Sequence, residues 1–217
     1  MNTNKQAFTL IETLVVIAII MLLVSLLFPA ASRIRQNSLR VKDASNLRQI
    51  GTAAQLYAGE NEGRMVPYFD YQKKLNGQTT YVWQYYLKEY MDGYKDMNVT
   101  EFMSAVVEPN SVFNAPGRKI QTNGRAYGLN PQVSNANWDN YINRVPNHAA
   151  IVHFGPMEAS NTEWMASSDG VPTWAAPMAF RYGDLTNFLY VDGHVGLKSA
   201  EEMTFVDSKG NSPYRWW

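Results

Sequence analysis

Residues 8–29 read FTLIETLVVIAIIMLLVSLLFP, and this stretch decides the architecture of the chain. From Leu14 to Phe28 no residue carries a charge. With Phe8 to Thr13 added, the apolar run reaches about 20 residues, the length that a helix needs to cross the hydrocarbon core of a bilayer. Its one charged side chain is Glu12, near the N-terminal end. The stretch therefore predicts a membrane-spanning helix that carries a single acid.

Three kinds of N-terminal segment fit such a run. A secretory signal peptide would end in a small-residue cleavage site, for which Pro29-Ala30-Ala31-Ser32 is a candidate. A plain signal anchor would span the membrane uncut. A leader that is cut on the cytoplasmic side of the run would leave the run attached to the mature chain. Glu12 favours the third kind, because a carboxylate near hydrocarbon is costly unless it is paired or held at the interface.

The charges on the two sides of the run point to the opposite topology. The short segment before it carries Lys5 and the α-amino group, whereas the far flank carries four cations, Arg33, Arg35, Arg40 and Lys42. The positive-inside rule alone would place that flank in the cytoplasm. This charge distribution therefore argues against export of the part of the chain that follows the apolar run.

The helical pattern resumes after the proline. Four apolar residues at spacings of three and four lie on one helix face: Leu47, Ile50, Ala54 and Tyr57. Gly59 and Gly63 are expected to end this helix. The sequence thus predicts one helix over about residues 9–58, with an apolar half and an amphipathic half. Pro29 inside it is expected to kink the helix or melt it locally.

The remaining chain predicts an α+β domain. Glycine, proline and asparagine punctuate short segments from Met65 onward. Two helical segments are expected, at 81–91 and 199–202, and strands are expected at 149–154 and 188–191. The second strand runs into Asp192-Gly193 and then residues 194–197, which predicts a β-hairpin with a tight turn. The amphipathic half of the helix would pack on this small antiparallel sheet.

Composition narrows the classes of function. The 217 residues include 19 basic and 19 acidic side chains and no cysteine. The balanced charge gives no general attraction to nucleic acid, so no nucleic-acid partner is expected, and the basic residues 33–48 fit a solvated or headgroup-facing helix. Disulfides, thiol catalysis and cysteine metal sites are excluded. Neither a nucleophile elbow nor a phosphate loop occurs, and we expect no enzyme activity.

Aromatic and metal-binding residues leave two questions open. Aromatic side chains are dense over residues 68–94 and 164–217, which suits either a packed core or a binding face. The histidines, His148, His153 and His194, have no third ligand at suggestive spacing. Asp184 and Asp192 could help to hold calcium, but no dense run of oxygen ligands surrounds them. No cofactor is expected, and calcium stays an alternative.

Residues Ala7-Phe8-Thr9-Leu10-Ile11-Glu12 resemble the leader-cleavage signal of type IV pilins and type II secretion pseudopilins. In that family an aromatic residue begins the mature chain, glutamate is fifth and a proline is twenty-second, which here are Phe8, Glu12 and Pro29. The resemblance implies cleavage between Ala7 and Phe8 by a prepilin peptidase and methylation of the new amino group. It also implies that Glu12 pairs with the amine of a neighbouring subunit. Ala7 departs from the usual glycine.

A second resemblance concerns the end of the helix and the C-terminal hairpin. Residues 46–51, Tyr57 and residues 63–67 are similar to the helix exit of pseudopilin-like proteins from planctomycetes and related bacteria. Residues 187–195, NFLYVDGHV, are similar to the processing-associated segment of those proteins, which has a histidine ten residues before the aspartate. Here that position is Tyr182. Ala115-Pro116 stands where many relatives have Cys-Pro, so their disulfide is absent.

Together these features predict a pilin-like chain in three parts: a leader (1–7), a transmembrane and filament-core helix (8–30) and a periplasmic or extracellular domain (31–217). The expected function is a structural subunit of a type II secretion pseudopilus or type IV pilus-like filament. The expected location is the bacterial inner membrane, with a single span, and the expected partners are prepilin peptidase and other pilins. The alternative is a monomeric, membrane-anchored protein displayed to bind a polysaccharide or surface layer.

Overall fold

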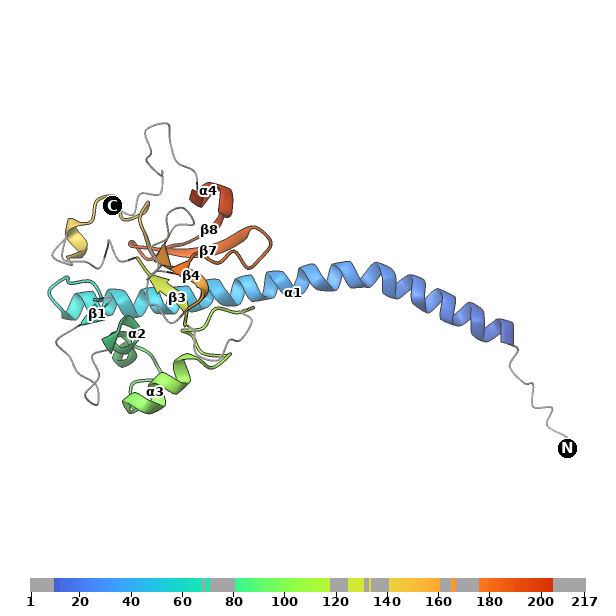
Figure 1. The fold of residues 1–217 in the computed structure, drawn as a ribbon, viewed down its shortest axis with the longest axis horizontal. Helices are drawn as coiled ribbons and strands as arrows, with labels where there is room; N and C mark the ends of the chain where they lie inside the picture. Colours follow the sequence, from blue (N-terminus) through green and yellow to red (C-terminus); the bar gives the residue numbers. More distant parts are fainter. Residues whose placement is uncertain are drawn as a thin grey trace. The chain divides into compact units, whose positions relative to one another are not determined.

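The computed structural model describes residues 10–67, 69–70, 81–117, 125–130, 133, 141–160, 165–166 and 176–204 (Figure 1). By its internal contacts the chain divides into two units, residues 1–38 and 39–217. The helices and strands follow in this order: α1 Leu10–Glu60, β1 Phe69–Asp70, β2 Tyr81–Val82, α2 Trp83–Leu87, the 3-10 helix η1 Lys88–Tyr90, α3 Val99–Val106, β3 Arg125–Leu129, the 3-10 helix η3 Ile142–Arg144, β4 Val152–Ser160, β5 Met165–Ala166, β6 Ala176–Pro177, β7 Leu185–Tyr190, β8 Val195–Ser199 and α4 Ala200–Thr204.

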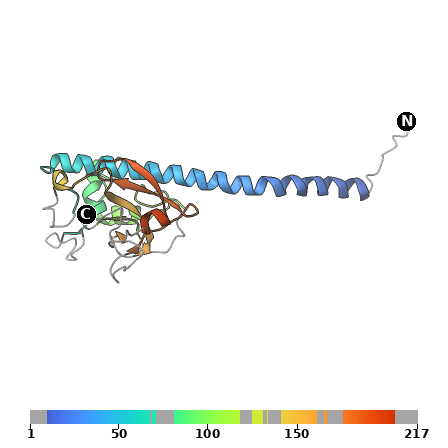
Figure 2. The same ribbon diagram turned by 90° about the horizontal axis from the view of Figure 1, so that it is seen from above.

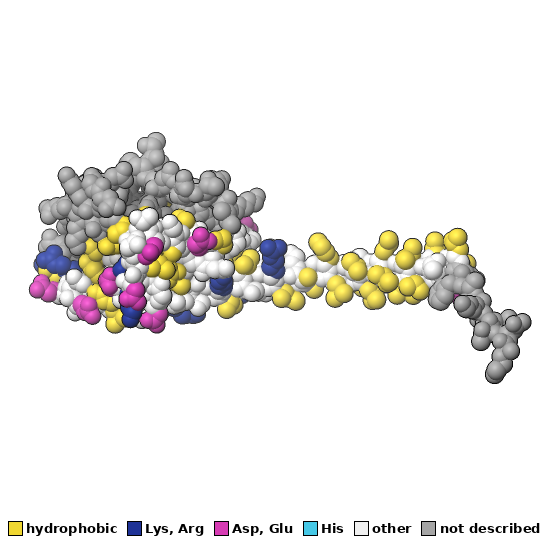
Figure 3. Space-filling model, turned by 90° about the horizontal axis from the view of Figure 1, so that it is seen from below, with side chains coloured by type: hydrophobic (Ala, Val, Ile, Leu, Met, Phe, Trp, Pro, Cys, Tyr) yellow, Lys and Arg dark blue, Asp and Glu magenta, His cyan; other side chains and the backbone are white. Residues whose placement is uncertain are grey.

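The long helix predicted from the sequence is present as α1, Leu10–Glu60. Its N-terminal part is long and apolar enough to cross a membrane, and none of its most apolar window is buried against the protein. Hydrophobic side chains cover this part of the helix (Figure 3). The large apolar side chains from Leu10 to Phe28 are at least half exposed. A helix with such a surface is stable only in lipid or when packed among other helices.

Pro29 does not melt the helix. α1 continues through it without a break, so the prediction of local melting is wrong, and a kink stays a prediction. Proline removes one backbone donor, but the residues around it, Leu26, Leu27, Ala30 and Ala31, are good helix formers. Gly59 lies inside α1 and does not end it. α1 ends at Glu60, and Glu62 (φ +57°) and Gly63 (φ +81°) then take positive φ, with the Gly63 N–H donating to the carbonyl of Ala58 at 2.7 Å.

The main sheet is antiparallel, with strand order β3-β4-β7-β8. The predicted hairpin is its β7–β8 pair, in register from Leu185↔Ser199 to Leu189↔Val195. The predicted strand at 149–154 begins later, at Val152, and extends to Ser160. Pro156 is tolerated because β7 pairs with β4 only at Val152 and Phe154. The predicted final helical turn is α4.

The core lies between α1 and the rest of the domain. Buried side chains of α1, among them Leu47 and Ile50, pack with Phe154 of β4 and Leu189 of β7. Neighbouring residues of β7 point to the opposite face, where Phe188 and Tyr190 pack with Val152, Met178 and Phe180. Because both faces of β7 are covered, this strand is buried along nearly its whole length. Figures 1 and 2 show the sheet and the α2–α3 segment along the C-terminal part of α1.

Aromatic residues of the α2–α3 segment belong to this core. Trp83, Phe102 and Phe113 are fully buried, and their rings meet edge to face, with centroids 5.8 Å apart for Trp83–Phe113 and 5.6 Å for Phe102–Phe113. The helix predicted at 81–91 is present as α2 and η1. For residues 83–113 the aromatic side chains therefore fill a core. In the second aromatic-rich range, 164–217, Phe180, Phe188 and Tyr190 also pack in the domain, whereas Trp164, Trp174 and residues 205–217 lie outside the described residues.

Candidate functional site: the N-terminal signal and the docking face of α1

Four residues are predicted to act in processing and assembly, and two of them belong to the described helix α1. Ala7 and Phe8 lie outside the described residues. Glu12 stands in the first turn of α1 and Pro29 stands inside the same helix. Seventeen residues separate the two, which corresponds to about 25 Å along the axis. The structure therefore does not bring Glu12 and Pro29 together, and each would act at its own level of the helix.

The hydroxyl groups of the apolar segment are satisfied within the helix. Thr13 donates its hydroxyl hydrogen to the carbonyl of Leu10 at 2.8 Å, and Ser25 donates to the carbonyl of Leu22 at 2.7 Å. A polar group without a partner in hydrocarbon costs several kcal/mol, about the value of a lost hydrogen bond in an apolar medium. These local bonds leave α1 suited to an environment of lipid or apolar helices.

A buried carboxylate links the C-terminal part of α1 to two strands. Asp43 is 1 % exposed and accepts hydrogen bonds from the hydroxyl of Tyr127 in β3 at 2.5 Å and the amide of Asn187 in β7 at 2.8 Å. The Asn187 amide also donates to the backbone carbonyl of Arg40 at 2.9 Å. Burial raises the pKa of Asp43 to about 6, although both hydrogen bonds and the charge of Arg181 act to lower it.

The Asp-Gly turn of the hairpin packs against α1. Gly193 has φ of +91°, and a Cβ there would lie 2.4 Å from Nε2 of Gln55. Gln55 donates to the backbone carbonyl of Asp192 at 3.1 Å. His194 donates its backbone N–H to the Asp192 carboxylate, its ring nitrogen lies 2.6 Å from the same oxygen, and its ring stacks on Tyr190. Burial acts to raise the pKa of Asp192, but the contacts with His194 bring it below its usual value.

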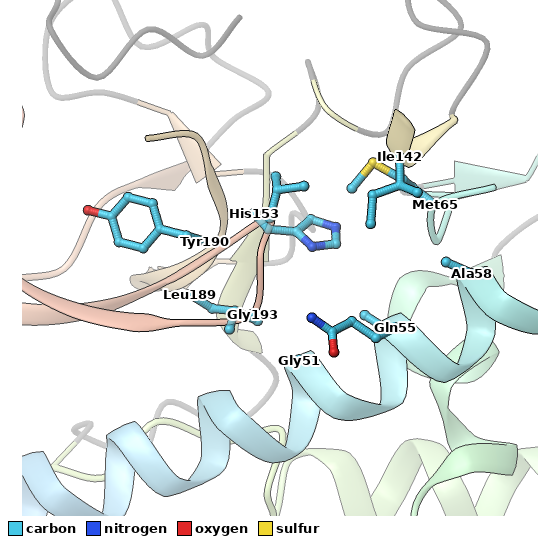
Figure 4. A pocket seen from close by; sticks show the side chains of 11 residues that line it. Gly51, Gln55, Ala58, Met65, Ile142, His153, Leu189, Tyr190 and Gly193 are labelled. Atoms are coloured by element: carbon cyan, nitrogen blue, oxygen red, sulfur yellow. The ribbon is translucent and has the colours of Figure 1, made fainter. Parts of the chain in front are cut away.

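A small pocket lies beside this contact, and residues of both α1 and the turn line it (Figure 4). Its empty volume is about 280 Å³, part of it open to solvent, and its lining is Gly51, Ala54, Gln55, Ala58, Met65, Ile142, His153, Leu189, Tyr190, Val191 and Gly193. His153 is buried, and its Nε2 atom has no hydrogen-bond partner. Burial lowers the pKa of His153 to about 3, so the imidazole is neutral at physiological pH.

The other residues singled out from the sequence have structural contacts and do not form one site. His148 contacts the carbonyl of Ile142 at 2.7 Å. Asp184 and Asp192 stand at opposite ends of β7, so they do not form one cation site, and calcium binding itself stays a prediction. Within the described ranges no group of three metal-ligating side chains occurs.

Tyr182 is the residue that the second sequence resemblance aligns with a histidine. It is buried, and its hydroxyl donates to the carbonyl of Pro116 at 3.2 Å. Burial raises the pKa of this phenol above its usual value, and the negative charge of Asp43 adds to the effect. In this chain the side chain of Tyr182 therefore connects the segment just before the hairpin to the turn at residues 115–117.

Sequence reasoning did not identify Asp43, Tyr127 or Gln55. Asp43 did carry a signal, since it lies four residues before Leu47 and seven before Ile50, on the face that is otherwise apolar. An acid at such a position predicts a buried partner. Its partners could not be named, because they lie 84 and 144 residues away along the chain.

Comparison with known proteins bears on the N-terminal segment. Residues 2–28 match the model of the prokaryotic N-terminal methylation motif. Searches of curated proteins and of solved structures returned no match. The processing-associated similarity of the C-terminal segment is not confirmed by these comparisons. The chain thus combines an α+β, pilin-like arrangement of a long helix and a small antiparallel sheet with a prepilin-type signal at its N-terminus.

Proposed function

We propose that the chain is a structural, non-catalytic subunit of a type II secretion pseudopilus or type IV pilus-like filament. The observation that carries the proposal is the methylation motif of residues 2–28, which includes the exposed apolar part of α1 from Leu10 to Phe28. Such a helix is stable in the bilayer before assembly. In a filament, the same apolar side chains would pack against those of neighbouring copies.

The proposed processing creates a positive charge with which Glu12 can pair. A prepilin peptidase on the cytoplasmic side of the inner membrane would hydrolyse the bond between Ala7 and Phe8. The new α-amino group on Phe8 would then be methylated and stay positively charged. The C-terminal domain would lie in the periplasm or outside the cell, with residues 8–30 as the single span.

Glu12 would then set the register between subunits. Its carboxylate would pair with the Phe8 amine of a neighbouring copy as the helices stagger. Removing one partner of a buried ion pair costs about 3–5 kcal/mol, because the other charge is left uncompensated. The register in which both charges are matched is favoured over its neighbours for this reason. Pro29 would act separately, at the far end of the span.

Cysteine crosslinking tests whether the chain polymerises. The chain has no cysteine, so single substitutions such as Val16→Cys and Ile20→Cys report only on their own positions. Both side chains are exposed along the apolar part of α1. In cells that carry the assembly machinery, a bifunctional thiol crosslinker should give ladders of oligomers at these positions. The ladders should be lost when Glu12→Gln is added.

One control and two contrary outcomes make this experiment decisive. Ser104→Cys on the exposed side of α3 reports on crosslinking that does not depend on the apolar helix. Monomer alone at Val16→Cys and Ile20→Cys would reject the filament and favour a monomeric protein displayed to bind a polysaccharide or surface layer. Ladders that persist in Glu12→Gln would reject the role assigned to the carboxylate.

A further inference from the structure

Two arginines stand just beyond the apolar part of α1. Arg33 and Arg35 are exposed, and the side chain between them, Ile34, is 69 % exposed. No acidic residue lies within four positions of either arginine along the chain, so neither can form an ion pair within the helix. All three residues belong to the same unit as the apolar segment. The segment therefore presents two cations and one apolar side chain to its surroundings.

The rise of the helix places these cations at the depth of the lipid headgroups. The 20 residues from Leu10 to Pro29 span about 30 Å, which matches the hydrocarbon core of a bilayer. Arg33 follows Pro29 by about 6 Å and Arg35 by about 9 Å. The polar layer on each side of a bilayer is roughly 5–7 Å thick. A long arginine side chain reaches that layer from either position.

We infer that Arg33 and Arg35 bind the phosphate groups of anionic phospholipids where α1 leaves the bilayer. A guanidinium group presents paired donors that match the oxygens of a phosphate, and its charge is never lost at physiological pH. The inference rests on the proposed function only in that α1 spans a membrane.

The unusual charge distribution around the span supports this inference. Cations beyond a span hinder its export with that end outside, so Arg33 and Arg35 work against the proposed topology. Cleavage before Phe8 would also remove Lys5, which leaves the mature chain with still fewer cations on the other side. Binding of anionic headgroups would give a function to two arginines that the proposed topology otherwise disfavours.

Native mass spectrometry of the full chain tests the inference. The protein, solubilised in a non-ionic detergent, would be exposed to equal amounts of phosphatidylglycerol and phosphatidylcholine, and the two lipid adducts counted. Each cation near the surface favours an anionic lipid, so the chain should prefer phosphatidylglycerol by roughly ten-fold. The double variant Arg33→Gln/Arg35→Gln should lose this preference. The matched control Arg48→Gln/Lys95→Gln removes two exposed cations from the domain and should keep it.

Two results would overturn the inference. One is equal binding of both lipids by the unaltered chain, and the other is a preference that survives in the Arg33→Gln/Arg35→Gln variant. Native mass spectrometry detects lipid bound to individual chains, so the experiment requires neither cleavage of the leader nor polymerisation. A failed filament proposal and a failed lipid site are therefore distinguishable.

Discussion

Asp43 is a carboxylate on the buried face of α1, and its burial has a consequence for stability. The pKa of Asp43 is about 6 in the folded chain, against an ordinary value of 3.8. Between these values the folded state keeps a proton that the unfolded state releases. The stabilising contribution of protonated Asp43 is therefore complete below about pH 3.8 and is lost as the pH rises through about 6.

His153 has the opposite effect. Its pKa of about 3 in the folded chain lies below the ordinary value of 6.5. The unfolded state therefore takes up a proton first, and the contribution of neutral His153 is present above pH 6.5 and is lost as the pH falls toward 3. Over about pH 4–6 the two groups oppose each other, and the free energy of unfolding should change little through their combined action.

Asp43→Asn should uncover the effect of His153. Between pH 6.0 and 4.5 the unaltered chain should gain about 1.5 kcal/mol from Asp43, and the variant should lack this gain. Its stability should therefore fall more steeply on acidification than that of the unaltered chain. Denaturant unfolding of the full chain in a non-ionic detergent at several pH values measures the difference.

The matched control for this experiment is Asp96→Asn, which removes an exposed carboxylate and the same charge. Its stability profile should run parallel to that of the unaltered chain. Parallel profiles for Asp43→Asn and the unaltered chain would show that Asp43 is not buried against Tyr127 and Asn187 as described.

At the scale of single elements, the sequence predicts α1 and the β7–β8 hairpin well. An unbroken apolar run and a three-and-four spacing determine α1, and Asp192-Gly193 between apolar segments determines the hairpin turn. Both signals lie in neighbouring residues, so they can be recognised without knowing which distant residues the segment contacts. The predicted end at Gly59 is wrong because glycine weakens a helix by only about 1 kcal/mol, which the packing of Ala53, Ala54 and Ala58 offsets.

The elements that the sequence does not predict are short or depend on distant contacts. β3 contains Gly128 and pairs with β4, whose sequence includes Gly155 and Pro156. β3 has no local pattern that competes with a loop, and β4 is predicted from the sequence only for its first residues, up to Phe154. α3 did have a signal, since Asn98 and Glu101 form a capping box before apolar residues. Eight residues of helix are marginal alone, and burial of Phe102 and Val106 stabilises them.

Gly193→Ala tests the packing of the hairpin on α1. The added methyl group would force an alanine into a positive φ and displace Gln55 from the carbonyl of Asp192. The strain and the lost hydrogen bond together should lower the free energy of unfolding by about 2 kcal/mol.

The matched control is Gly59→Ala, where no atom lies within 4 Å of the new Cβ and the backbone is helical. This variant should be as stable as the unaltered chain or more stable, by up to about 1 kcal/mol. Equal stability of Gly193→Ala and the unaltered chain would contradict the described contact between the turn and the helix.

At the scale of the whole molecule, the N-terminal signal and the domain differ in how far the sequence alone predicts them. The signal is a local pattern in residues 2–28, and the sequence is enough to find it. The domain is held by contacts between segments far apart in the chain, such as Asp43 with Asn187, and no local pattern reveals them. For this reason the sequence predicts how the chain is processed better than what its domain contacts.

The central claim is that this chain is processed as a prepilin, and the mass of its mature N-terminus tests it most directly. The chain would be expressed in cells with a prepilin peptidase, purified from the membrane and analysed as its N-terminal peptide. We expect a chain that begins at Phe8 with one methyl group on its amine. A chain that begins near Ala31 or Ser32, or that keeps Met1, would contradict it.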